Sequence, residues 1–134
     1  MNLHELSETP TWDWPDDAPE VLLAVLQDRS ASVADRQLVA SLAAEIDVMD
    51  DAFATALLRI AGDGDEDVEL RAAAAIALGP SLEYADILDP EELAEEEAFS
   101  AASIRRVEAS LQAIYHAADT PDSLRRAALE ASVR

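Results

Sequence analysis

The chain has 134 residues, half of them hydrophobic and only 4 % aromatic, which predicts one domain with a core of alanine and aliphatic side chains. It carries 29 acidic residues against nine basic ones, giving a formal net charge of −20. This charge argues against binding to nucleic acid or to an anionic membrane, because both need cationic side chains. The absence of cysteine excludes disulfides and thiolate zinc sites. No apolar run approaches the roughly 18 residues that cross a bilayer, and no signal peptide is recognisable, so we expect a cytoplasmic protein.

Residues 1–17 are expected to form a non-helical tail or cap, because Pro10 and Pro15 interrupt any helix. Trp12 and Trp14 are two residues apart and would point the same way on an extended segment. We expect them to cover the open end of the first pair of helices. Anchoring of a partner protein is the alternative role.

Apolar residues at helical spacing predict six longer helices, near 18–28, 33–45, 49–61, 67–78, 100–117 and 121–134. The predicted start signals are Asp17 with Pro19 in the first turn, Ser32, Asp67, Ser100 or Ser103, and Thr120 followed by Pro121. The predicted stop signals are Gly62 and the Gly79-Pro80 pair. The side chains expected to face inward are Val21, Leu22, Val25, Leu26, Leu38, Leu42, Ile46, Phe53, Ala56, Leu57, Ile60, Ile104, Val107, Leu111, Ile114 and Tyr115.

The helical pattern repeats at a fixed spacing. Arg71 follows Arg36 by 35 residues, and Arg125 follows Arg71 by 54, which is the same period with an insert of 19 residues. A period in the thirties is typical of stacked helical pairs. The predicted fold is therefore all-α, an α-solenoid of about three antiparallel helical hairpins. The expected repeats are 18–46, 49–79 and 100–134, within a repeat domain 18–134.

The insert, residues 80–98, holds eight carboxylates between Glu83 and Glu97 and no basic residue. Its apolar side chains predict partial docking on the helices, with a short helix after Asp89-Pro90. The last helix reaches Arg134 without a Gly, an Asn or a capping hairpin. Because a terminal repeat normally presents a polar outer face, we expect either a longer array, which we prefer, or a homodimer through this helix.

The repeated motif Leu-Arg-x-x-Ala-x-x-Ala resembles bacterial HEAT-like repeats, which form armadillo-like α-α superhelices. The strongest matches are residues 65–79 and 120–131. The resemblance implies a binding scaffold, and a subset similar to phycobilisome-lyase repeats assists chromophore attachment. It also implies that an aspartate near the turn meets the arginine of the second helix. Asp28 and Asp63 hold that place, but the third unit has Ala117, so Asp119 or Asp122 would substitute.

The residues that catalysis requires are not recognisable. Residues 63–67 imitate the start of a calcium loop, yet Val68 and Ala74 replace its essential glycine and glutamate. The two histidines, His4 and His116, lack metal-binding spacing. There is no glycine-rich phosphate loop and no nucleophile motif. We therefore predict no enzyme, no cofactor and no metal site.

These observations predict a non-enzymatic protein–protein interaction scaffold whose partner is an unidentified protein. In such repeats the second helices usually line the binding face, and the insert would add an acidic surface. The candidate partner-binding residues are Arg36, Arg71, Arg125, Arg126, Glu83, Asp86, Glu95, Glu96 and Glu97. Two alternatives stay open: lyase-like or chaperone-type binding of a small molecule in the groove, and an acidic decoy that mimics nucleic acid.

Overall fold

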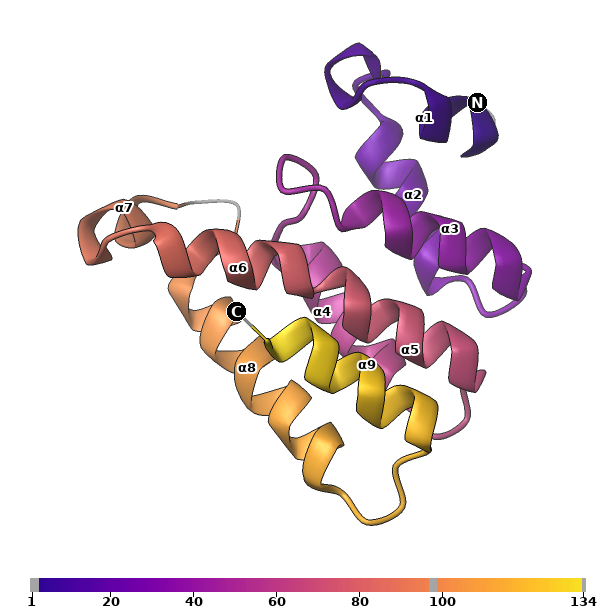
Figure 1. The fold of residues 1–134 in the computed structure, drawn as a ribbon. Helices are drawn as coiled ribbons and strands as arrows, with labels where there is room; N and C mark the ends of the chain where they lie inside the picture. Colours follow the sequence, from indigo (N-terminus) through magenta and orange to yellow (C-terminus); the bar gives the residue numbers. More distant parts are fainter. Residues whose placement is uncertain (1–2, 97–98, 134) are drawn as a thin grey trace.

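The computed structural model describes residues 3–96 and 99–133, and within them it is all-helical without a strand, which confirms the predicted class (Figure 1). The predicted tail, insert and last helix include residues 1–2, 97–98 and 134, which lie outside the described residues. The helices are α1 (Leu3–Glu8), a 3-10 turn η1 (Thr11–Asp13), α2 (Ala18–Gln27), α3 (Val33–Ala43), α4 (Asp51–Gly62), α5 (Val68–Ala77), α6 (Gly79–Ile87), α7 (Pro90–Glu95), α8 (Ala101–His116) and α9 (Asp122–Ser132).

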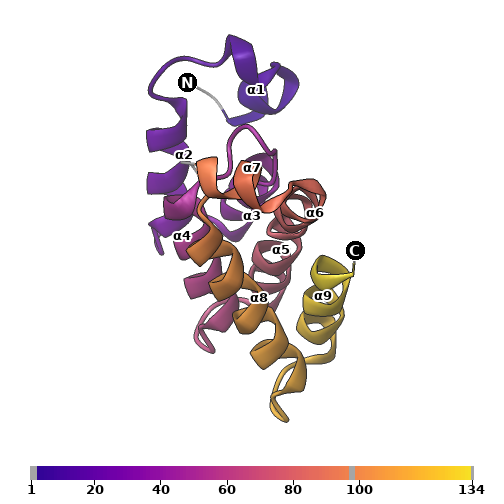
Figure 2. The same ribbon diagram turned by 90° about the vertical axis from the view of Figure 1, so that its left-hand side faces the viewer.

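The longer helices lie in two layers. Consecutive helices pack against each other, α2 on α3, α4 on α5 and α8 on α9. In one layer α4 lies between α2 and α8, and in the other α5 lies between α3 and α9 (Figure 2). Helix α5 can contact α3, α4 and α9 closely because its buried side chains are mostly alanine: Leu70, Ala74, Ala75 and Ala77. Small side chains thus set the spacing at the centre of the molecule.

The helix boundaries keep the period read from the sequence. The first helices of the three pairs end at Gln27, Gly62 and His116, and the second helices begin at Val33, Val68 and Asp122. Both sets are separated by 35 and then 54 residues. The positions before the second helices are Ser32 and Asp67, which each cap an amide three residues on, at 3.1 Å, and Pro121, which has no side-chain acceptor. The cap predicted at Thr120 is therefore one residue too early.

The N-terminal segment differs from the predicted tail. It forms α1, whose Leu6 is buried and which packs against α3. Trp14 is partly buried, and its Nε1 donates to the carbonyl oxygens of Leu6 and Thr9 at 3.1 and 3.0 Å. Trp12 lies in the turn η1 and is 82 % exposed. The expectation that both rings cover the first pair of helices is therefore wrong for Trp12, because the segment forms a turn rather than extended chain, whereas Trp14 packs against the core.

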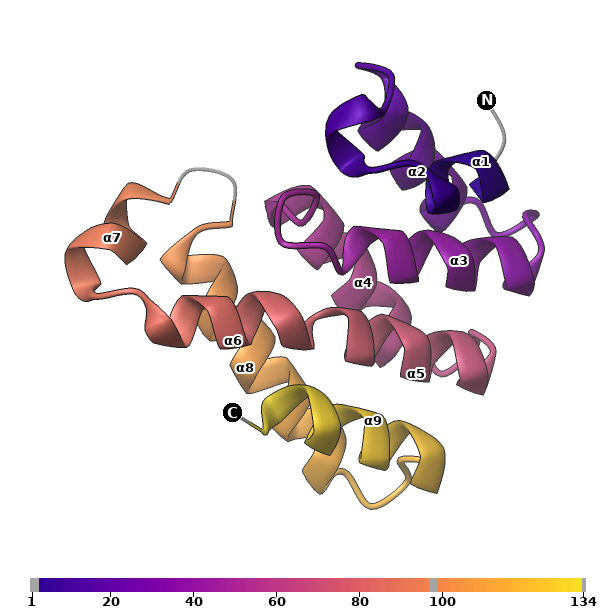
Figure 3. The same cartoon turned by 45° about the horizontal axis from the view of Figure 1, so that its top comes forward.

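The insert is more helical than expected. Gly79-Pro80 was predicted to end a helix, but only Leu78 interrupts it, and α6 continues in nearly the direction of α5 (Figure 3). A proline in a first helical turn is tolerated because its missing N–H has no intrahelical acceptor there. Helix α6 packs against α8 and α9. The short helix predicted after Asp89 is confirmed as α7, which a capping box of Asp89 and Glu92 starts.

Two side chains expected to face inward are exposed. Ile46 is 48 % exposed, because α3 ends at Ala43 and the chain turns before α4. Tyr115, in the last turn of α8, is 37 % exposed. Among the described residues, no helix is long and apolar enough to cross a membrane.

Candidate functional site

Three arginines make the same contact in the three helical pairs. The Nε atoms of Arg36, Arg71 and Arg125 each donate to a backbone carbonyl ten residues earlier, those of Leu26, Ala61 and Tyr115, at 3.0, 3.1 and 3.0 Å. Each acceptor lies in the last turn of the first helix, where carbonyls lack intrahelical partners. These three backbone-anchoring arginines therefore join the second helix of each pair to the end of the first.

Arg36 is fully engaged within the chain and is only 4 % exposed. Its Nη2 also donates to the Leu26 carbonyl at 3.0 Å. Its Nη1 and Nη2 donate to Oε1 and Oε2 of Glu66 at 3.1 and 2.7 Å, a two-pronged pairing that suits a planar guanidinium. Glu66 precedes α5, so this bond joins the first pair of helices to the second. As a predicted partner-binding residue, Arg36 presents almost no surface.

The aspartates that the resemblance assigned to these arginines act mainly on their own loops. The Ser30 hydroxyl and N–H donate to Asp28 at 2.6 and 2.9 Å and lower its pKa, and Arg36 adds to this effect. The Asp65 N–H donates to Asp63 at 2.9 Å and lowers the pKa of Asp63, with further help from Arg29 and Arg71. Asp63 also pairs with Arg29. Neither aspartate is hydrogen-bonded to the anchoring arginine of its own pair in any described contact.

The other candidate arginines are more accessible. Arg71 is half-buried. Arg125 adds a bond from Nη2 to the Ala117 carbonyl at 2.8 Å and lies 3.7 Å from Asp122, one of the two substitutes expected in the third unit. Arg126, the next residue on α9, is exposed.

Arg125 and Arg126 belong to a surface that we call the open flank, formed by Tyr115, Asp122, Arg125, Arg126 and Leu129 around a shallow pocket of about 300 Å³. Leu129 is 48 % exposed, whereas the corresponding Ala40 and Ala75 of the earlier pairs are fully buried. Tyr115 likewise corresponds to the buried Ala61. These two positions of the third pair are therefore open to solvent, whereas the corresponding alanines of the earlier pairs are covered. Leucine and tyrosine are also larger than the alanines that they replace.

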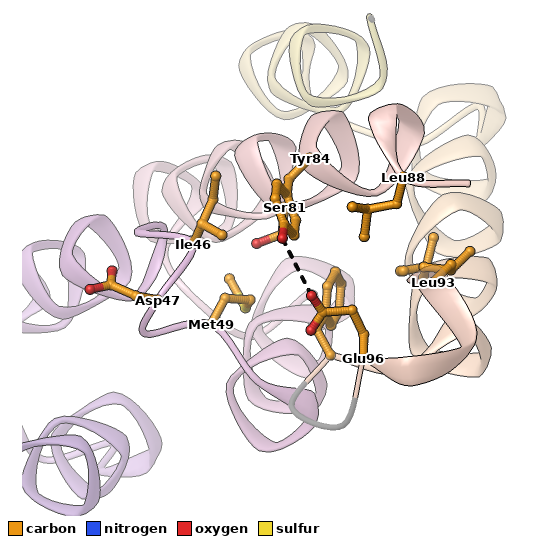
Figure 4. Close-up of a pocket in the computed structure, with 10 residues that line it drawn as sticks. Ile46, Asp47, Met49, Ser81, Tyr84, Leu88, Leu93 and Glu96 are labelled. Carbon is orange, nitrogen blue, oxygen red and sulfur yellow. Dashed lines mark hydrogen bonds between the residues drawn. The ribbon is translucent and has the colours of Figure 1, made fainter. Parts of the chain in front are cut away.

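The insert forms a second hollow, the insert pocket, of about 300 Å³ (Figure 4). Inside it the Tyr84 hydroxyl donates to Glu96 Oε1 at 3.4 Å. Its lining residues come from α6, α7, the start of α8 and the chain before α4: Ile46, Asp47, Met49, Ser81, Tyr84, Leu88, Leu93, Glu96, Phe99 and Ile104. Sequence reasoning found the apolar residues of the insert but not that they enclose a pocket with Met49 and Ile104.

The acidic candidates of the insert are placed separately from the arginines of the open flank. Glu83, Asp86 and Glu95 are exposed on α6 and α7. Glu96 is half-buried and faces the insert pocket, while Glu97 lies outside the described residues. The structure therefore does not bring the predicted site residues together: Arg125 and Arg126 lie on the open flank and the described acidic candidates lie on the insert, whereas Arg36 is buried and Arg71 lines neither surface.

Asp51 connects two elements that the sequence did not link. Its Oδ1 accepts the N–H of Ser100 at 2.9 Å, which ties the start of α4 to the N-cap of α8. Burial opposes the charged form, but hydrogen bonds from Ser100 and Ser103 outweigh it and lower the pKa of Asp51.

In the described part of the chain, no group of three or more histidine, aspartate or glutamate residues is placed to hold a metal ion. Comparison with family models, curated proteins and solved structures gave no match.

Proposed function

We propose that the protein is a non-enzymatic protein-interaction module, built as an α-solenoid of three HEAT-like helical pairs. The helix boundaries support this arrangement, because the ends of the first helices and the starts of the second helices keep the same offsets of 35 and then 54 residues, and so do the three equivalent arginine contacts. A residue that meets the same carbonyl in three successive pairs is the expected signature of a repeated structural unit. Such repeats serve as scaffolds, and their function depends on the surface they expose.

The open flank is the partner-binding surface in this proposal. The observation that carries it is the exposure of Leu129 at a position where the two earlier pairs bury an alanine. Leu129 and Tyr115 are still 48 % and 37 % exposed, so a partner that covers them gains hydrophobic free energy; for Leu129 this is about half of the ~1.5–3 kcal/mol that full burial of a leucine provides. Arg125 and Arg126 add positive charge to a chain with a net charge of −20, which favours a partner segment that combines apolar and acidic side chains.

A second copy of this chain fits that description, since it is strongly acidic and has its own exposed apolar residues. The proposal therefore includes a homodimer as one form of the interaction. The exposed carboxylates Glu83, Asp86 and Glu95 would form a separate acidic contact surface on the insert.

The experiment compares matched charge variants of the full chain. Leu129→Glu and Arg126→Glu change the open flank, Arg105→Glu makes the same charge change on the exposed side of α8, and Glu83→Lys with Asp86→Lys changes the insert. Self-association is measured by sedimentation velocity over a wide concentration range, and partner capture by pull-down with each immobilised variant. We expect Leu129→Glu and Arg126→Glu each to weaken binding at least about tenfold, the effect of losing a hot-spot residue.

Arg105→Glu should leave binding unchanged, because Arg105 lies outside the open flank. Binding that survives both flank variants would refute the assignment of this surface. Loss of binding only in the insert variant would move the interface to α6 and α7.

Small-molecule binding is a second candidate function, favoured by the insert pocket. Apolar walls with a few polar groups are typical of ligand sites, and here Tyr84 and Glu96 are the polar groups. An apolar fluorescent dye should bind with enhanced emission, and Leu93→Glu should abolish this signal while Arg105→Glu keeps it. Unchanged emission in Leu93→Glu would reject the pocket as the binding site. No specific contact favours the nucleic-acid decoy, and we do not propose it.

A further inference from the structure

The two junctions between helical pairs differ in their ion pairs. At the first junction, two arginines of the first pair bind two acids of the second pair: Arg36 binds Glu66, and Arg29 binds Asp63. The corresponding residues of the second junction, at the same offsets of 35 and 54 residues, are Arg71 with Thr120 and Gly64 with Ala117. Of the four charged side chains at the first junction, only one has a charged counterpart at the second, the guanidinium of Arg71.

The shortened side chains leave a space, which we call the Arg71 pocket. It is an open hollow of about 480 Å³ between the second and third pairs, lined by Gly62, Gly64, Arg71, Ala113, Ile114, Ala117, Asp119, Thr120 and Pro121. A Cβ atom built on Gly62 or on Gly64 would meet nothing within 4 Å. The hollow therefore lies where the first junction holds the side chains of Arg29, Asp63 and Glu66.

Arg71 keeps donors available in this pocket. Its Nε donates to the Ala61 carbonyl at 3.1 Å, as the repeat requires. Within residues 3–96 and 99–133, its Nη1 and Nη2 make no hydrogen bond, whereas the same two atoms of Arg36 hold Glu66. A guanidinium with two parallel donors free is suited to a carboxylate.

The start of α9 adds to the positive potential. Pro121, which lines the pocket, is the N-cap of α9 and offers no side-chain acceptor to the first-turn amides. The Thr120 hydroxyl, the other nearby polar group, donates to the Ile114 carbonyl at 2.7 Å. Uncapped amides and the helix dipole both favour an anion at such an end.

We propose that the Arg71 pocket binds a monocarboxylate with a short apolar body, whose carboxylate takes the place that Glu66 occupies at the first junction. Ala113, Ile114 and Pro121 supply the apolar contacts. Asp119, also in the lining, disfavours a second negative charge on the ligand. The carboxylate can come from a free acid or from a glutamate side chain of a peptide. The inference rests on the equivalence of the helical pairs and not on the open flank.

The nearby Asp63 does not occupy the site. It interacts electrostatically with Arg71, but its carboxylate accepts hydrogen bonds from the Asp65 N–H and from Arg29. Asp28 stands in the same relation to Arg36, and Arg36 still holds Glu66. One aspartate beside the guanidinium is thus compatible with a bound carboxylate.

The test uses the full chain and three probes: sodium butyrate as the free acid, the blocked tripeptide acetyl-Ala-Glu-Ala-amide as the peptide, and butyramide as the uncharged control. The readout is the 15N–1H resonances of the Arg71 Nε–H group and of the backbone amides of residues 113–120 and 122–124, at constant ionic strength held with sodium chloride. Butyrate or the peptide should give saturable shifts confined to these residues, and butyramide should not. If butyrate binds more tightly than the tripeptide, the pocket is a site for a free acid; if the tripeptide binds more tightly, it is a site for a peptide.

Variants make the assignment specific. Arg71→Gln should weaken binding at least about tenfold, whereas Arg105→Gln, which removes the same charge from an exposed part of α8, should not. Thr120→Glu should create at the second junction, with Arg71, the ion pair that Arg36 and Glu66 form at the first. It should therefore abolish binding and raise the thermal midpoint by about 3 °C. Thr120→Gln, of similar size but uncharged, should give no such rise. Asp119→Asn should strengthen binding severalfold.

Butyramide shifts equal to those of butyrate, or undiminished binding in Thr120→Glu, would overturn the proposal even if Arg71→Gln fails to fold. If Arg105→Gln weakens binding as much as Arg71→Gln does, binding depends on the net charge of the protein and not on the Arg71 pocket, and the proposal is wrong. Leu129→Glu, which alters the open flank, should leave butyrate binding intact, so this inference and the proposed function fail separately.

Discussion

The carboxylate of Glu66 accepts hydrogen bonds from both terminal nitrogens of Arg36, a residue thirty positions earlier and in the preceding helical pair. Their side chains are only 10 % and 5 % exposed. The pair therefore lies in the interior of the first junction, where solvent screens it little and where either partner alone would be a buried charge. Arg125 makes the same backbone contact in a more exposed setting, with its side chain 34 % exposed.

This difference predicts a hierarchy among the anchoring arginines. Arg36→Ala should lower the free energy of unfolding by about 3–5 kcal/mol, because it leaves Glu66 buried without its partner. Arg125→Ala should cost about 1 kcal/mol, the net worth of an ordinary hydrogen bond. Urea unfolding followed by circular dichroism measures both.

The double variant Arg36→Ala/Glu66→Ala separates the pair from the backbone contact. It should be less destabilised than the sum of the single variants, because it removes both charges. Equal losses in Arg36→Ala and Arg125→Ala would contradict the buried ion pair.

The starts of α3, α5 and α8 were predictable because local chemistry sets them. Ser32, Asp67 and Ser100 have side-chain oxygens that accept the amide three residues later, and each does so here. The period of 35 residues was recognisable because Arg36 and Arg71 make the same contact, each with the carbonyl ten residues earlier. Local preference and repeat spacing therefore led to the same helices.

The features that sequence reasoning missed depend on contacts between distant segments. Nothing local distinguishes Glu66 from its acidic neighbours, and only the packing of the next helical pair brings it to Arg36. Gly79-Pro80 reads as a stop, yet α6 continues because it can pack on α8 and α9. The tail folds into α1 because Leu6 and the ring of Trp14 find a place against the first pair.

A second prediction concerns Gly79, at the link between α5 and α6. A Cβ atom there would lie 3.2 Å from the Cα of Ala131 and 3.5 Å from its carbonyl oxygen, both on the backbone of α9. Backbone atoms cannot rotate away as a side-chain tip does, so α9 would have to shift. Gly79→Ala should therefore lower the free energy of unfolding by about 1 kcal/mol, and Gly79→Val by about 1–3 kcal/mol, typical of overpacking.

Gly62→Ala is the matched control for that series, because a Cβ on Gly62 has open space around it. It should stabilise the protein by about 0.4–1 kcal/mol through the reduced freedom of the unfolded chain. Thermal unfolding of the three variants side by side decides the matter. Stabilisation by Gly79→Val would show that α9 does not approach α6 as closely as the structure places it.

A third prediction follows from Asp51, which accepts the Ser100 N–H at the start of α8. Its pKa is lowered in the folded protein, since the hydrogen bonds from Ser100 and Ser103 outweigh the effect of burial. A lowered folded-state pKa contributes stability that is complete above the unfolded value of about 3.9 and is lost as the pH falls through the folded value. Asp51→Asn should be less stable than the wild type by about 1 kcal/mol at neutral pH.

The difference between wild type and Asp51→Asn should shrink as the pH falls below about 4. Urea unfolding of both proteins between neutral and acidic pH measures it, and taking the difference removes the contribution of the many other carboxylates. A difference that stays constant with pH would mean that Asp51 does not gain stability from its charge.

The last prediction concerns local stability. Helix α5 contacts α3, α4 and α9 and buries four of its side chains, whereas α7 buries none and rests on the half-buried Leu93 and on the bond between Tyr84 and Glu96. Because local opening costs least where few apolar contacts are lost, amides of α7 should exchange with deuterium far sooner than those of α5. Leu93→Ala should speed exchange further in α7 while leaving α5 unchanged, as hydrogen exchange read by mass spectrometry would show. Protection of α7 equal to that of α5 would mean that the insert unfolds only with the whole domain, which its contacts do not predict.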